Sequence, residues 1–307
     1  MRVLQLVEAQ SARLSQAGVS FGHGTTNAFD EAAWLVQWAL GLPLDGLDDH
    51  AQRAVSASER LVIEALVERR IKTRKPAAYL TNQAWLQGVA FHVDERVIVP
   101  RSFIAELLAD ASIDAWLGLQ TRRVLDLCTG SGCLAVLAAM AWPEVRIDAA
   151  DISEDALAVA RINVDAHELQ DRITLLRSDG LSTLTDRYDL ILCNPPYVNA
   201  DAMANLPPEY RAEPELALAG GTDGRLQRAR QANVSEEVTS STGSSADLFL
   251  WVFCCGCAAS EDNEASTRSI CCRSASGSAI GERWRFVGGG AAAKIAKRGM
   301  KRVTLLS

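Results

Sequence analysis

Between residues 123 and 198 the chain alternates short apolar runs with helical patterns, and this alternation restricts its fold more than any other feature. Apolar runs predict four strands, at 123–127, 146–150, 173–176 and 188–193. Helical patterns separate them at 133–140 and behind Ser153, a typical N-cap residue. Repeats of strand, helix and strand predict a parallel sheet with helices on both faces. We therefore expect an α/β fold in this part of the chain.

The part of the chain before this segment predicts helices. Asn27 is suited to cap a helix whose buried stripe is expected to include both Trp34 and Trp38. Ser56 and Glu59 form a capping box for a further helix. A helical domain therefore precedes the sheet.

The residues between these two parts change to the period of strands. Alternating apolar residues at 84–86 and 89–93 predict a hairpin around Gly88. A further strand is expected at 97–99, and a helix after the string Pro100-Arg101-Ser102. The linker is thus a hairpin.

Charge and composition exclude some classes of protein. The net charge of −7 disfavours a protein whose main task is to grip nucleic acid. The longest apolar run, around 248–255, is too short to cross a bilayer, and the first residues do not resemble a secretory signal. Cys128, Cys133 and Cys193 lie inside strand or helix patterns and are expected to be buried thiols. We expect a cytoplasmic protein.

Glycine or acidic residues follow three of the predicted strands, where ligands bind in sheets of this kind. The turn that runs from Asp126 through Thr129 and Gly130 to Gly132 lets backbone approach a ligand, although it does not match the fingerprint G-x-G-x-x-G. Asp151 is suited to accept both ribose hydroxyls, or is a simple acid at a helix N-terminus. The pair Ser178-Asp179 either receives an adenine amino group or forms a turn.

The most specific motif is the string Asn194-Pro195-Pro196-Tyr197, which directly follows an apolar strand. Its two prolines fix the backbone and remove two N–H donors, so that backbone oxygens are free to point into a cleft. Asn-Pro also occurs in ordinary turns, but the whole string after a buried strand favours a binding site.

These motifs together resemble the HemK/Prm family of protein N(5)-glutamine methyltransferases. The resemblance spans about residues 20–224 and includes two later strings, Glu209-Tyr-Arg-Ala-Glu213-Pro and Gly221-Thr-Asp-Gly. Two strings resemble the branch that acts on large-subunit ribosomal protein L-three, Phe21-Gly-His-Gly-Thr and Val93-Asp-Glu-Arg-Val. The release-factor branch typically has Arg-Pro-Glu-Thr-Glu where this chain has Arg101-Ser-Phe-Ile-Ala.

The resemblance implies a Rossmann-like class I methyltransferase that uses S-adenosylmethionine and no metal. Asn194 and the Pro195 carbonyl would accept hydrogen bonds from a glutamine NH2 group, with Pro196 and Tyr197 completing the catalytic corner. The cofactor would be held by Asp126, Thr129, Gly130, Gly132, Asp151, Asp179 and Asn194. The implied partner is ribosomal protein L-three, with no membrane and no direct nucleic-acid binding. The oligomeric state stays open.

We divide the chain accordingly into four parts. Residues 1–75 would form a helical substrate-recognition domain, 76–99 a β-hairpin linker, and 100–224 the catalytic domain. The tail, 225–307, is expected to be disordered. His23, which lies between two glycines, is expected in a turn or at the surface.

Other functions stay open at this stage. A release-factor glutamine methyltransferase belongs to the same family, and a DNA adenine methyltransferase shares the Asn-Pro-Pro-Tyr chemistry but needs a basic face. A catalytically inactive remnant that binds ribosomal protein is an alternative of another class. A nicotinamide-dependent dehydrogenase is disfavoured by the imperfect glycine fingerprint.

The composition changes abruptly near Arg225. The tail mixes serine, arginine and glycine with five of the chain's eight cysteines. Residues 248–253 are the one stretch there that predicts a strand, so the last strands of the fold are expected to be missing. Cys254 and Cys257 have zinc-like spacing but no second pair like it. A shifted reading frame explains this composition best, and a chain that lost its last strands is expected to be poorly folded or inactive.

The coding DNA beyond codon 224 tests the shifted frame directly. One of the other two frames is expected to restore apolar strands, because the complete fold needs them to cover its sheet. If neither frame contains such a pattern, the tail is a genuine divergent sequence.

Overall fold

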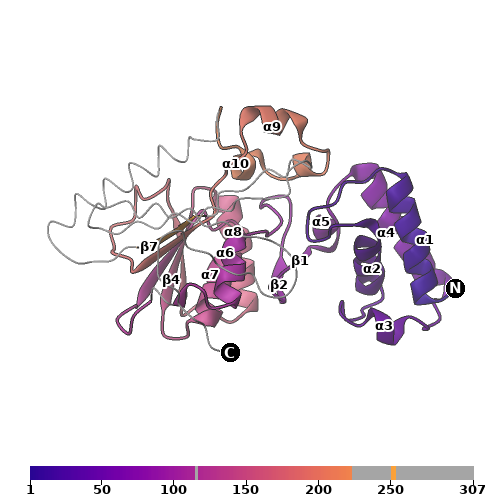
Figure 1. Cartoon of the computed structure of the whole chain (residues 1–307), viewed down its shortest axis with the longest axis horizontal. Coiled ribbons are helices and arrows are strands. Elements are labelled where there is room, and N and C mark those ends of the chain that lie inside the picture. The colour runs from indigo at the N-terminus through magenta and orange to yellow at the C-terminus, as the bar shows by residue number, and fades with distance from the viewer. Residues whose placement is uncertain (115–116, 223–249, 254–307) are drawn as a thin grey trace, which may run out of the picture.

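The computed structural model describes residues 1–114, 117–222 and 250–253 of the chain. In Figure 1 a helical domain lies at one end, a parallel sheet with its helices lies at the other, and a small hairpin lies between them. The parallel sheet and the element order confirm an α/β, Rossmann-like fold with a helical N-terminal part.

The sheet has five parallel strands in the order β5-β4-β3-β6-β7. Their bounds are β3 Arg123–Leu127, β4 Arg146–Asp151, β5 Ile173–Arg177, β6 Leu190–Cys193 and β7 Leu250–Phe253. The chain moves outward from β3 to β5 on one side and then returns to place β6 on the other side of β3. The strand order therefore reverses between β3 and β6, which is where sheets of this class bind their ligands.

Three helices cover one face of the sheet: α6 Phe103–Ala109, α7 Cys133–Ala141 and α8 Glu154–Ala166. Side chains such as Val124, Ile147 and Leu190 pack against this layer. Leu125 and Ile191 alternate with them and face the opposite side, where Leu181 and Leu184 from the β5–β6 connection pack on them. The expectation of helices on both faces is wrong for the part of the chain described here, because this connection forms no helix and covers the sheet with single side chains.

Two helices of the helical domain begin at the capping residues that the sequence predicts. It contains α1 Val3–Gln16, α2 Ala28–Ala39, α3 Leu47–His50, α4 Ala57–Thr73 and α5 Ala77–Thr81. The Asn27 side chain accepts from the Asp30 amide, and Ser56 and Glu59 form the expected capping box. Trp34 is buried beneath Gly24, whereas Trp38 is 40% exposed one turn further on, so the prediction for Trp38 is wrong.

The linker contains the predicted hairpin, with β1 Gln83–Leu86 paired antiparallel to β2 Val89–His92. The strand expected at 97–99 does not form. The Val97 carbonyl accepts from the Tyr79 hydroxyl at 2.5 Å, and the Val99 amide donates to Glu213 Oε1 at 2.9 Å. Side chains thus form hydrogen bonds with the backbone groups that would otherwise pair with a neighbouring strand.

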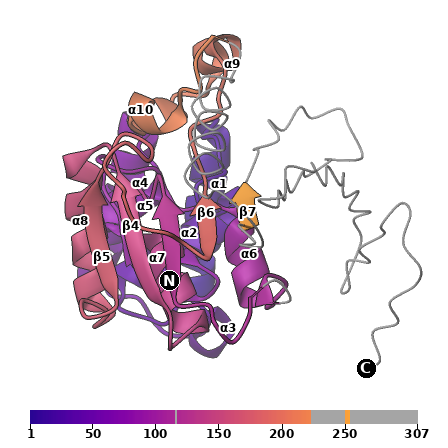
Figure 2. The ribbon, with the colours of Figure 1, turned by 90° about the vertical axis from the view of Figure 1, so that its left-hand side faces the viewer.

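A long excursion follows β6 and contains α9 Ala200–Asn205, a 3-10 turn at Tyr210–Ala212 and α10 Glu215–Leu218. It closes on itself, because the Val198 amide donates to the Leu218 carbonyl at 2.9 Å and the Gly220 amide to the Val198 carbonyl at 2.8 Å. Figure 2 shows α9 and α10 above the sheet strands.

One strand of the tail was predicted and is confirmed, because β7 pairs in parallel with β6 through Leu190 and Leu250. The expectation that β6 lacks a neighbour on this side is therefore wrong. Most of the tail prediction, including its disorder and the cysteines from Cys254 onward, lies outside the described residues. Within the described ranges, no helix is long and apolar enough to cross a membrane.

Leu190→Ala should test how much the centre of the sheet contributes. Leu190 is fully buried between β3 and β7, so truncation is expected to lower the free energy of unfolding by about 2–5 kcal/mol. Leu119→Ala, at a leucine that is 92% exposed, should change it by less than about 0.5 kcal/mol. Urea titration measures both, and equal losses would contradict this account of the core.

Candidate active site

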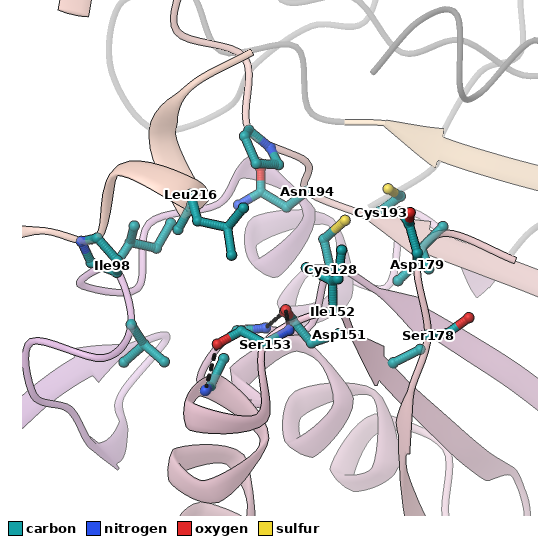
Figure 3. Close-up of a pocket in the computed structure, with 18 of the residues that line it drawn as sticks. Ile98, Cys128, Asp151, Ile152, Ser153, Ser178, Asp179, Cys193, Asn194 and Leu216 are labelled. Atoms are coloured by element: carbon teal, nitrogen blue, oxygen red, sulfur yellow. Dashed lines mark hydrogen bonds between the residues drawn. The ribbon is translucent and has the colours of Figure 1, made fainter. Parts of the chain in front are cut away.

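A cleft lies outside the carboxyl ends of the central strands, at the reversal of strand order (Figure 3). Of the residues predicted for the site, five line it: Gly130, Asp151, Asp179, Asn194 and Pro196. The other five lie beside or beneath the lining: Asp126, Thr129, Gly132, Pro195 and Tyr197. The sequence thus predicted where the cleft lies. It did not distinguish the residues that line the cleft from those that lie behind the lining.

The turn after β3 needs left-handed backbone at three positions. Cys128, Gly130 and Gly132 have φ of 61°, 55° and 78°. A Cβ on Gly130 would meet nothing within 4 Å, so its backbone is open to a ligand, whereas one on Gly132 would lie 3.1 Å from Ala160 of α8. Gly130 therefore serves the cleft and Gly132 serves helix packing. Cys128 takes a conformation that favours glycine, and it lines the cleft rather than lying buried as predicted.

Asp126 supports this turn from beneath. It is fully buried, and its Oδ2 accepts from the Thr129 hydroxyl at 2.5 Å and from the Ala135 amide at 3.0 Å. Its Oδ1 has no hydrogen-bond partner among the described residues. Burial raises the pKa of Asp126 to about 7 despite these two bonds. The carboxyl thus holds the turn and the start of α7 together.

Asp151 connects the turn to the end of β4. Its Oδ2 accepts from the Gly130 amide at 2.9 Å and its Oδ1 from the Ser153 amide at 3.0 Å. Burial raises the pKa of Asp151, and the amides of Ser153 and Gly130 oppose that rise. Asp151 was predicted either to bind a ligand or to be an acid at a helix N-terminus. It is placed for both, because it accepts from an amide near the start of α8 and also lines the cleft. The Ser178 amide donates to the Asp151 carbonyl at 2.9 Å, which brings the wall around Asp179 beside it.

The Asn-Pro-Pro-Tyr corner enters the cleft from β6. Leu127 pairs with Cys193, so the ends of β3 and β6 bring the glycine turn and Asn194 to the same edge. The Oδ1 atom of Asn194 is buried and has no hydrogen-bond partner among the described residues. Tyr197 is 37% exposed just beyond the lining. An acceptor of this kind beside a cleft is suited to a donor that arrives with a ligand.

Sequence reasoning missed two walls of the cleft. Arg96, Val97 and Ile98 come from the linker, and Pro214, Leu216 and Ala217 come from the excursion. In Figure 3, Ile98 and Leu216 lie together on the side opposite Asp179. The pattern at 97–99 was interpreted as a strand, and α10 is too short to give a period. Arg96, Val97 and Pro214 belong to strings that carry the family resemblance, but no local signal marked them or the other three as walls of a cleft.

The cleft fits a nucleoside with a charged chain. Apolar side chains that a ligand would cover include Ile152, 40% exposed, and Leu216, 60% exposed. Asp151 and Asp179 add acceptors for hydroxyl or amino groups, and Gly130 leaves room for close approach. No group of His, Cys, Asp and Glu suited to hold a metal occurs among the residues that the structure describes.

Asp126→Asn tests the buried carboxyl by its pH dependence. The folded pKa of about 7 lies above the ordinary 3.8, so protonation stabilises the fold fully below about pH 4, and this contribution is lost as pH rises to about 7. Asparagine keeps an acceptor without the charge. We expect the variant to gain stability relative to the parent by more than about 1 kcal/mol between about pH 5 and 8, measured by urea titration. Asp45→Asn, at an exposed aspartate, is the control variant.

The known proteins that this chain resembles agree with one another in family and in name. Residues 105–207 match the family described as "Methyltransferase small domain", and residues 5–81 match "PrmC N-terminal domain". Three curated relatives carry the name ribosomal protein uL3 glutamine methyltransferase. The Burkholderia pseudomallei protein is 52% identical over 72% of this chain and 75% of its own length. The Bordetella pertussis protein is 54% identical over 71% and 74%, and the Bradyrhizobium diazoefficiens protein is 50% identical over 72% of each.

These identities extend over more than two thirds of both chains in each pair. The resemblance to HemK/Prm proteins and the S-adenosylmethionine-dependent chemistry of that family are thereby confirmed. The chain belongs to the family of S-adenosylmethionine-dependent protein glutamine methyltransferases, which includes these three relatives named for ribosomal protein uL3.

Proposed function

We propose that this chain methylates the side-chain amide nitrogen of a glutamine in ribosomal protein L-three, the uL3 of its relatives' names. The observation that carries the proposal is the buried, unpartnered Oδ1 of Asn194 at the end of β6. An amide NH2 group is the donor that such an acceptor lacks. Identities of 50–54% to three curated uL3 methyltransferases support this target over a release factor.

The corner presents acceptors and few donors. Pro195 and Pro196 have no N–H, so the carbonyl of Pro195 and the Oδ1 of Asn194 act without competing backbone donors. We assign both oxygens to the two hydrogens of the glutamine NH2 group. Holding those hydrogens fixes the nitrogen in the cleft and favours electron density on it, which matters because its lone pair is delocalised into the carbonyl.

Bound S-adenosylmethionine supplies a methyl group on a positively charged sulfur, which is already electrophilic. We assign Asp151 to its ribose hydroxyls, Gly130 to close backbone contact, and Asp179 to its adenine amino group. Asp126, Thr129 and Gly132 act indirectly, by holding the turn in shape. We assign Asn194 to contacts with both S-adenosylmethionine and the substrate glutamine.

Tyr197 completes the corner in this proposal. Its half-buried ring follows Pro196 directly, and we assign it to packing on the flat amide of the substrate. Arg101 lies close enough to interact electrostatically with Tyr197. No strong base is required, because the methylated, positively charged nitrogen releases its proton readily to water.

We place this activity in the cytoplasm, with the helical domain as the part that recognises the protein substrate. Three cysteines in the described ranges are free thiols, which is usual in a reducing compartment. The division between a helical part and a catalytic part is supported by two core clusters. One is centred on α1, α2 and α4 and extends to Ala156 and Val159 of α8, and the other is built on the sheet.

A crossed pair of variants tests the assignment. Asn194→Ala should lower methyl transfer by at least about a hundredfold, as loss of a reaction-centre acceptor does, while cofactor affinity changes less than about threefold. Asp151→Ala should instead weaken cofactor binding by at least about tenfold. Tritium transfer to uL3 measures the first and calorimetry with S-adenosylhomocysteine the second. Asn205→Ala, an exposed asparagine on α9, serves as the matched control.

The choice of acceptor separates this function from its rivals. The same assay is run with uL3, with a release factor and with DNA. Faster labelling of the release factor or of DNA would refute the uL3 assignment. A chain that binds the cofactor yet labels none of them would instead be the inactive remnant. An unchanged rate in Asn194→Ala would remove the corner from the mechanism.

A further inference from the structure

The excursion after the corner inserts two buried carboxylates between the domains. Glu209 and Glu213 have fully buried side chains although they lie on a surface excursion. In Figure 1 this orange segment lies between the sheet and the helical domain. Burying carboxylates is costly unless each is paired, so their partners show what the excursion holds.

Glu209 binds the helical domain. Its Oε1 accepts from the Ser20 amide at 3.1 Å and pairs with Arg74 Nε at 2.7 Å and with Arg70 Nη1 at 3.4 Å. Arg70 is itself fully buried and also pairs with Glu31 of α2 at 2.8 Å. All three groups around Glu209 belong to residues 1–75. This carboxylate therefore anchors the excursion to the ends of α1 and α4.

Glu213 binds the linker and the base of the catalytic part. Its carboxylate accepts from the Val99 amide at 2.9 Å and from Arg101 by two bonds of 2.8 and 2.6 Å. His23 Nε2 lies 3.6 Å away. His23 lies in a bend, where the Gly22 amide donates to the Thr25 carbonyl, but it is buried, so of the two expected positions the surface one is wrong. Burial raises the pKa of Glu213, but His23 and Arg101 outweigh it and hold the pKa at about 2.

Tyr210 fills the space between the two carboxylates. Its ring lies 4.2 Å from that of His23, and the Arg101 guanidinium lies 5.3 Å from its centre. A Cβ on Gly22 would lie 2.6 Å from the Tyr210 hydroxyl oxygen, so no side chain fits there without a shift. We call Glu209, Tyr210 and Glu213 the clamp.

The other end of the excursion is tied to the corner. Val198 follows Tyr197 directly and is hydrogen-bonded to Leu218 and Gly220, while Leu216 lines the cleft. One continuous segment thus runs from the acceptor corner to the helical domain and back to the cleft wall. A shift of the clamp would move the helical domain relative to Asn194.

We propose that Glu209 and Glu213 are positioning residues that fix the helical domain relative to the Asn194–Tyr197 corner, so that a protein bound to that domain delivers its amide to the corner. This inference rests on the proposed function and adds how a folded protein substrate is aligned. Neither carboxylate lines the cleft, so they act through the domain and not on the reacting atoms.

Glu209→Gln separates alignment from general support, because two substrates of different size report differently. With intact uL3, which would span the helical domain and the cleft, kcat/KM should fall at least about tenfold. With a short peptide that carries the target glutamine and reaches only the cleft, it should stay within about twofold. Affinity for S-adenosylhomocysteine should also stay within about twofold. Glu68→Gln, an exposed carboxylate on α4 that pairs with Arg13, is the matched control.

The exchange rate of a backbone amide tests whether the clamp is intact, and this measurement does not depend on catalysis. The Ser20 amide donates to Glu209, and it should exchange at least about tenfold faster in Glu209→Ala, which removes the acceptor oxygen that glutamine would keep. If Glu209→Gln fails to fold, Arg74→Gln removes the partly exposed outer partner and should give the same pattern more weakly. The inference would be overturned if kcat/KM fell equally with uL3 and with the peptide, or if it did not fall with uL3.

The proposed function fails separately, if the parent chain labels neither uL3 nor the peptide. The clamp is then judged from Ser20 exchange and from uL3 binding measured by calorimetry. Unchanged Ser20 exchange together with unchanged uL3 binding in Glu209→Ala would overturn it in that case as well.

Discussion

The parallel pairing of β3 with β6 is the constraint on which the rest of the site depends. It aligns Leu127 with Cys193, so two turns that are more than sixty residues apart in the chain meet at one edge of the sheet. One turn is rich in glycine and open to a ligand, and the other carries an acceptor amide between a strand and two prolines. A methyl donor and a planar amide can share a cleft because strand order reverses at this place.

The cleft combines strained backbone with buried charge, and both carry a cost in stability. Cys128 is in a left-handed conformation, and the pKa of Asp126 is raised to about 7 because burial disfavours its charge. Such features persist when neighbouring structure fixes them. Here β3, β4 and α7 do so, through the amide of Ala135 and the pairing of Leu127 with Ala150.

Buried ion pairs play a different part between the domains. A buried pair adds little net stability compared with an apolar contact, but removing one partner leaves a charge that the interior cannot solvate. Arg70, Glu31 and Glu209 form such a group, and Arg101 with Glu213 forms another. Their value lies in allowing few alternative arrangements of the two domains, which is what the proposed alignment of a protein substrate requires.

Local patterns in the amino-acid sequence predicted most of the helices and strands and the location of the cleft. Periodicity predicted β3 to β6, the capping residues Asn27 and Ser56 predicted where helices begin, and one apolar stretch of the tail predicted β7. These signals are local, since a cap or a strand pattern acts over a few residues. The motifs after β3, β4 and β6 likewise lie next to the strands that position them.

Tertiary structure alone decided which residues line the cleft and which are buried. Ile98 and Leu216 join the cleft from distant parts of the chain, Trp38 is exposed although it shares a helix with buried Trp34, and His23 is buried against Glu213. The stretch at 97–99 has the composition of a strand, yet its backbone bonds to Tyr79 and Glu213. Burial and long-range hydrogen bonds depend on what the fold brings close, and no local pattern contains that information.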